Sequence, residues 1–135
     1  MKYLVCLIGL LSIVFVSVSS GSVANKTSPL WYMTETMKVK AFTDSLFPEQ
    51  VVDLNARNDK GQPVWTRHCE WADGAGIVVP QVDSSSTYLY RVISSRFATN
   101  AAVHMTYDDG IEVWLNGQKI ASNPSGSPTL SLIHI

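Results

Sequence analysis

Residues 108–120 read DDGIEVWLNGQKI, and this stretch decides the fold class of the chain. Ile111, Val113 and Leu115 alternate with a glutamate and a tryptophan, which is the period of a β-strand. These three side chains are predicted to face the core.

A tight hairpin is predicted directly after this strand. Asn116 and Gly117 stand together, and a two-residue hairpin turn of the right twist needs positive φ at both positions. Asn-Gly is therefore the strongest short-range hairpin signal, and residues 118–120 are expected to form the returning strand. Residues 108–110 (DDG) predict another turn on the other side of the strand.

Two further strands are predicted upstream of the hairpin. Residues 87–93 (TYLYRVI) are aromatic and β-branched, and residues 101–107 (AAVHMTY) alternate in the manner of a strand. Many short strands separated by polar turns indicate an all-β sandwich or barrel.

The hydrophobic pattern is less regular in residues 31–83, which precede these strands. Residues 31–83 show no long window with a period of 2 or 3.6, which favours long loops with short strands at 64–66 and 77–79. A helix within residues 44–52 is limited by Pro48 to about one or two turns. Trp31 is expected to be the first packed residue.

These residues resemble the central strands of galactose-binding-like jelly-roll modules. The resemblance covers residues 31–123 and is carried by TYLYR at 87–91, DDG at 108–110, VWLNGQK at 113–119, Trp31, residues 47–54, Trp65 and WADG at 71–74. These residues further resemble the version of this module in large secreted proteins of planctomycete-type bacteria, which also carry cytochrome c and DUF1549/DUF1553 regions. The Gly-Pro-Phe common after the first tryptophan is absent here. The resemblance implies an all-β, galactose-binding-like jelly-roll β-sandwich. It implies no single function, because such modules occur in glycosidases, proteases and surface proteins alike.

The N-terminus predicts export. Lys2 supplies a positive end, residues 3–18 are an almost unbroken apolar run, and residues 22–24 (SVA) have the small-x-small form that signal peptidase cleaves, with 18–20 as an alternative. The competing interpretation is an uncleaved anchor, but the run is at the short edge of what spans about 30 Å of hydrocarbon. A bacterial secreted, periplasmic or cell-surface location follows, with membrane contact only in transit.

The C-terminus predicts an incomplete module. Residues 121–129 are turn-rich, and residues 130–135 (LSLIHI) resemble the read-through of a sequencing adapter, with a genuine terminal strand as the alternative. We therefore expect 1–24 to be a signal peptide, 25–30 a flexible lead-in, 31–123 a partial β-sandwich and 124–135 a turn-rich end with a non-native tail. Downstream domains of the same chain are the expected partners.

Composition limits the remaining choices. A chain of 135 residues holds one domain, and its net charge of −1, with both signs scattered, offers no basic patch for nucleic acid. With Cys6 in the leader, Cys69 would be alone, so no internal disulfide is expected, and burial as a small hydrophobe is favoured over pairing elsewhere.

No motif predicts catalysis, a metal or a cofactor. Two adjacent aspartates at 108 and 109 are too few for calcium and are better explained by the turn. Residues 68–70 (HCE) alternate between faces of a strand, which does not suit zinc. There is no nucleophile elbow, phosphate loop or His-Glu-x-x-His helix, so a non-catalytic module is expected.

A carbohydrate is the expected ligand. Sugars stack on aromatic faces and hydrogen-bond to Asp, Asn or Arg, and Trp114 is predicted to lie on the face opposite the core residues, with Tyr107, Asp109 and Asn116 nearby. Three alternatives stay open: Trp114 covers a loop or strand end, the module is purely structural, or it is an accessory domain of a secreted glycoside hydrolase.

Overall fold

The computed structural model describes residues 2–9, 13–15, 17–19, 30–71, 76–80, 82–93, 100–105, 110–124 and 129–134. These residues form a mostly β structure with antiparallel sheets and one short helix. The elements are β1 (Lys2–Gly9), β2 (Ile13–Phe15), β3 (Ser17–Ser19), β4 (Trp31–Thr34), β5 (Met37–Lys38), α1 (Phe47–Gln50), β6 (Trp65–His68), β7 (Gly76–Val78), β8 (Ser85–Ile93), β9 (Asn100–Met105), β10 (Ile111–Leu115), β11 (Gln118–Asn123) and β12 (Thr129–His134).

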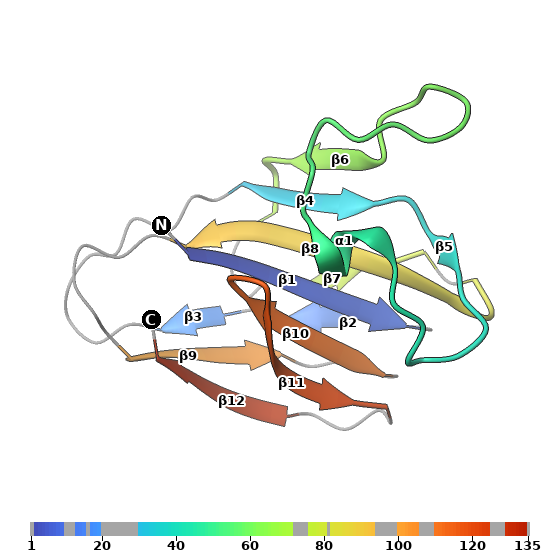
Figure 1. The fold of residues 1–135 in the computed structure, drawn as a ribbon. Coiled ribbons are helices and arrows are strands. Elements are labelled where there is room, and N and C mark those ends of the chain that lie inside the picture. The colour runs from blue at the N-terminus through green and yellow to red at the C-terminus, as the bar shows by residue number, and fades with distance from the viewer. Residues whose placement is uncertain are drawn as a thin grey trace.

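The largest sheet has seven strands. Its order is β11-β10-β1-β8-β4-β6, with β5 also paired to β8 (Figure 1). A three-stranded sheet has the order β12-β9-β3, and β2 pairs with β7. Because β1 is antiparallel to both β8 and β10, those two strands run parallel to each other. The all-β prediction is confirmed at this level.

The predicted hairpin is confirmed. Asn116 and Gly117 have φ angles of 54° and 78°, both in the left-handed region that the turn requires. The strands β10 and β11 pair on either side of this turn, with a register shift between Val113 and Trp114. The hairpin thus folds as its local sequence dictates.

The other predicted elements lie close to their expected places. Strand β8 begins two residues before the predicted strand at 87–93. Strand β6 begins one residue after the predicted strand at 64–66 and ends two residues later, and β7 lies one residue before the predicted strand at 77–79. The predicted strand at 101–107 is present as β9 up to Met105, and residues 106–109 lie outside the described residues. The helix α1 has four residues, and Pro48 stands near its start, where the missing N–H is tolerated.

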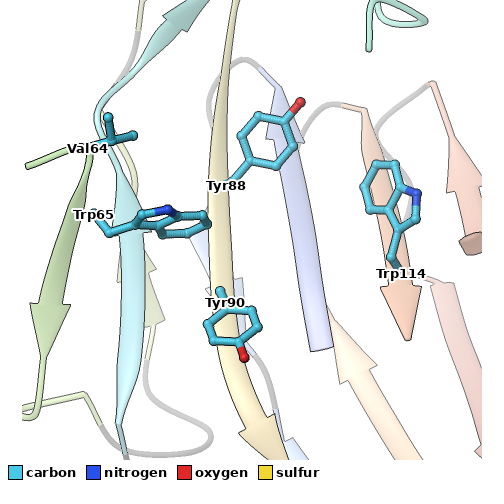
Figure 2. Close-up of a cluster of buried hydrophobic side chains, with 5 residues drawn as sticks. All are labelled: Val64, Trp65, Tyr88, Tyr90 and Trp114. Atoms are coloured by element: carbon cyan, nitrogen blue, oxygen red, sulfur yellow. The ribbon is translucent and has the colours of Figure 1, made fainter. Parts of the chain in front are cut away.

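Both faces of the central strands are buried, not one. Ile111 and Val113 are at most 2% exposed, as expected for the predicted core face. On the opposite face, Figure 2 shows a cluster of five side chains, here called the aromatic cluster: Val64, Trp65, Tyr88, Tyr90 and Trp114. Partly buried apolar residues cover it, namely Tyr32, Met37, Leu46, Val52, Leu54, Ala56 and Val92. The irregular segment around α1 therefore acts as a second layer over the sheet.

Trp31 is buried on β4, but it is not the first residue in the fold, because β1, β2 and β3 precede it in the sheets. It is 1% exposed, and the guanidinium of Arg91 lies 4.6 Å from its ring centroid. Arg91 is itself fully buried, so this cation–π contact is in a desolvated setting, where such contacts are strongest.

The two chain ends both enter sheets. The segment predicted to be a signal peptide supplies β1, between β8 and β10, and the segment suspected to be non-native supplies β12, paired with β9. Cleavage of the leader and the origin of residues 130–135 remain predictions. The predicted lead-in at 25–30 is described only at its last residue, Leu30. Within the described residues, no helix has the length and apolar character needed to cross a membrane.

The expected burial of Cys69 is wrong. The thiol is free and exposed, because the residue follows the last residue of β6, His68, at a bend where the chain leaves the sheet. The side chains of its neighbours His68 and Glu70 contact each other, with 2.6 Å between Nδ1 of His68 and Oε1 of Glu70.

Candidate functional site

A cavity of about 640 Å³ lies between α1 and the β10–β11 hairpin. One wall, here called the helix wall, comes from α1 and the chain after it, and the other, the hairpin wall, comes from β10 and the turn. The lining residues are Pro48, Glu49, Gln50, Val51, Val52 and Leu54 from the helix wall, Tyr90 from β8, and Trp114, Asn116 and Gly117 from the hairpin wall.

Two residues of the aromatic cluster, Tyr90 and Trp114, line the cavity. Tyr90 and Trp114 are each only 5% exposed, so they present limited ring surface. Tyr90 packs edge-on against Trp65, with 6.1 Å between ring centroids, and is tilted against Tyr32 at 6.0 Å. Such packing fixes the ring orientation, which gives the cavity a rigid apolar base.

A long-range hydrogen bond ties the helix wall to the sheet. The Tyr88 hydroxyl donates to Oε1 of Glu49 over 2.6 Å, and the Leu46 amide donates to the same oxygen over 3.4 Å. Burial, together with the Glu49 carboxylate, raises the pKa of Tyr88 far above its usual range. At neutral pH the hydroxyl therefore stays protonated and keeps donating.

The hairpin wall is held by a buried carboxylate. Oε1 of Glu112, a residue that is 4% exposed, accepts from Lys119 Nζ and Ser122 Oγ, each at 2.8 Å. The same Lys119 nitrogen lies 5.0 Å from the centroid of the Trp114 ring. Ion pairing and a cation–π contact thus act together to fix the tryptophan.

The structure brings together two of the four predicted site residues. Trp114 and Asn116 both line the cavity, whereas Tyr107 and Asp109 lie outside the described residues. Trp114 does lie opposite the face of Ile111 and Val113, but its ring is covered by the segment around α1 and is not an open platform. This burial agrees with the alternative in which Trp114 packs against a loop or a strand end.

Other lining residues were not predicted from the sequence. Tyr90 could have been found, because it alternates with Tyr88 in a strand that was predicted. Glu112 is not a lining residue, but its alternation with Trp114 places it on the same face of β10, where it holds the hairpin wall. No comparable signal exists for Glu49 and Gln50, which come from a segment without a period.

The cavity is suited to binding by hydrogen bonds and aromatic contact. In the part of the chain that the structure describes, its lining includes one carboxylate, from Glu49, and the side-chain amides of Gln50 and Asn116, but no serine, threonine, cysteine, histidine or lysine. Among the residues that the structure describes, no group of three or more His, Cys, Asp or Glu side chains could hold a metal ion. Away from the cavity, His68 stacks on Trp71 with 3.8 Å between ring centroids.

Comparisons with protein-family models, with curated proteins and with solved structures found no match to this chain.

Proposed function

We propose that this chain is a non-catalytic, galactose-binding-like jelly-roll module of an exported bacterial protein, and that its cavity binds a carbohydrate. The observation that carries the proposal is the meeting of two aromatic rings with carboxylate and amide groups in one cavity. Sugar rings offer apolar C–H faces and hydroxyl edges, and this combination matches both.

The charge of the cavity favours a neutral sugar. Within the described part of the lining, Glu49 is the one charged residue, and no lysine or arginine stands there to pair with an acidic ligand. A uronic acid would place a second carboxylate near Glu49, where like charges repel. The volume of about 640 Å³ lies within the range of about 300 to 1,000 Å³ that is usual for small-ligand sites.

Calorimetry with galactose, lactose and glucuronate tests this function. The variant Asn116→Gly removes the side-chain amide yet keeps a residue that tolerates the positive φ of the turn. We expect it to weaken binding of the neutral sugars about tenfold, the loss of roughly one hydrogen bond. Thr66→Ala, an exposed change outside the cavity, is the matched control and should bind normally. Failure of all neutral sugars to bind at millimolar concentration would contradict the proposal.

The second candidate is a purely structural module. The 5% exposure of Trp114 favours it, because a ring that is almost fully covered offers little surface for stacking. In that case no sugar changes the tryptophan fluorescence, and Asn116→Gly alters stability alone. An accessory domain of a glycoside hydrolase would bind sugar in the same way as the proposed module. Hydrolysis of the glycosidic bond would then take place in another domain.

A further inference from the structure

The position between β8 and β10 is a gap one strand wide that β1 fills. Eight residues of β1 pair with β8 and five pair with β10, so the two flanking strands make no direct pairing at this position. Figure 2 shows β1 passing between the strand that carries Tyr88 and Tyr90 and the strand that carries Trp114. Removal of the predicted leader at residues 1–24 would empty this gap.

An empty gap would be costly. Leu89 on β8 and Val113 on β10 are completely buried with β1 in place, and loss of β1 would leave the inner backbone edges of both strands unpaired. The flanking strands are parallel to each other, and a single antiparallel strand satisfies both of their inner edges. The described strands after Leu30 already hold other positions in the sheets.

We propose that this gap is a peptide-binding slot, which a partner polypeptide fills with an extended apolar strand, antiparallel to β8 and β10, after the leader has been removed. The chemistry of the occupant is given by β1, whose sequence KYLVCLIG is apolar after its first residue. Backbone hydrogen bonds along both edges supply the affinity, as in other cases of β-strand addition. The inference rests on the proposed export of the chain.

The slot also controls the cavity. Val5 of β1 is the register partner of both Tyr90 and Trp114, so the occupying strand separates the two aromatic residues of the cavity. Neighbouring strands lie about 4.8 Å apart, so closure of the empty slot would bring β8 and β10 closer by about that distance. Strand uptake should therefore strengthen sugar binding, and sugar should strengthen strand uptake to the same degree.

The test uses the full chain with a protease site introduced within residues 21–29. After cleavage and removal of the leader, a fluorescent peptide with the sequence of residues 2–9 is added. We expect one peptide to bind per chain and to slow hydrogen exchange of the β8 and β10 amides at least 100-fold. A control peptide carrying Val5→Pro, which removes one backbone donor, should bind at least tenfold more weakly.

Three outcomes would contradict the proposal of a peptide-binding slot. The cleaved chain keeps full exchange protection of β8 and β10 without peptide, it forms a dimer that takes up no peptide, or it unfolds and is not rescued by the peptide. Sugar binding is measured on the same samples. Peptide uptake without any sugar binding would contradict the proposed function but support the slot. Sugar binding by a chain that takes up no peptide would support the proposed function but contradict the slot.

Discussion

The two walls of the cavity differ in how their shape is encoded. The hairpin wall is specified locally, by an alternating strand and an Asn-Gly turn whose φ angles are both positive. The helix wall has one four-residue helix, and its contacts with the sheet include a hydrogen bond between residues 39 positions apart, Glu49 and Tyr88. A site can thus combine a wall that forms by itself with a wall that forms only on the finished sheet.

The largest expected effect is on the packing that both walls share. Trp114→Ala would remove the largest ring of the aromatic cluster at the cavity and should lower the free energy of unfolding by about 3 to 5 kcal/mol. Chemical denaturation measures this loss. Trp114→Phe keeps an aromatic ring and should cost clearly less; equal losses in the two variants would show that ring packing is not the cause.

A change at Tyr88 should destabilise the helix wall and leave the hairpin wall unaffected. Tyr88→Phe keeps the ring but leaves the Glu49 carboxylate without its closest donor, at an expected cost of about 1 to 3 kcal/mol. Hydrogen exchange should speed up in α1 and stay unchanged in the β10–β11 hairpin. Equal acceleration in both regions would mean that the walls are not independent.

Alkaline pH should act on the same contact. The pKa of Tyr88 is raised in the folded state by burial and by the Glu49 carboxylate, so the folded state resists deprotonation. Stability linked to this group is complete below about pH 10, the usual tyrosine value, and is lost as the pH rises beyond it. Denaturation midpoints between pH 8 and 11 should fall less for Tyr88→Phe than for the native chain. An identical decline in both proteins would exclude Tyr88 as the source.

The smallest expected effect is at the turn. Gly117→Ala places a side chain at a φ of 78°, with no atom within 4 Å of the new Cβ, so its cost is backbone strain of about 1 kcal/mol. Gly61→Ala is a matched control, since its φ is 76° and its surroundings are equally open, but it does not line the cavity. Both should lose similar stability, and only Gly117→Ala should weaken sugar binding.

The same contrast explains how much could be predicted from sequence. The hairpin, β8 and one face of β10 were predictable because a period of 2 and an Asn-Gly turn are local signals. The burial of Trp114 was not, because the residues that cover it, such as Leu46 and Val52, come from a segment with no period. Burial of both faces of a strand depends on what packs against it, and an alternating pattern alone suggests that only one face is covered.

The exposure of Cys69 and the role of Glu49 have the same explanation. Whether a small apolar residue is buried depends on where its strand ends, and β6 ends one residue before Cys69. Glu49 was indistinguishable from other acidic residues until the sheet placed Tyr88 beside it. Long-range contacts of this kind leave no spacing that can be recognised in the sequence.

The central claim is that the cavity between the two walls receives a neutral sugar. Mapping of ¹⁵N and ¹H chemical shifts during a lactose titration tests this claim most directly. We expect saturable shifts at the Trp114 indole, at the Asn116 side-chain amide and at the backbone of Glu49, which together line the cavity from both walls. Shifts confined to residues outside the cavity, or none at saturating lactose, would contradict it.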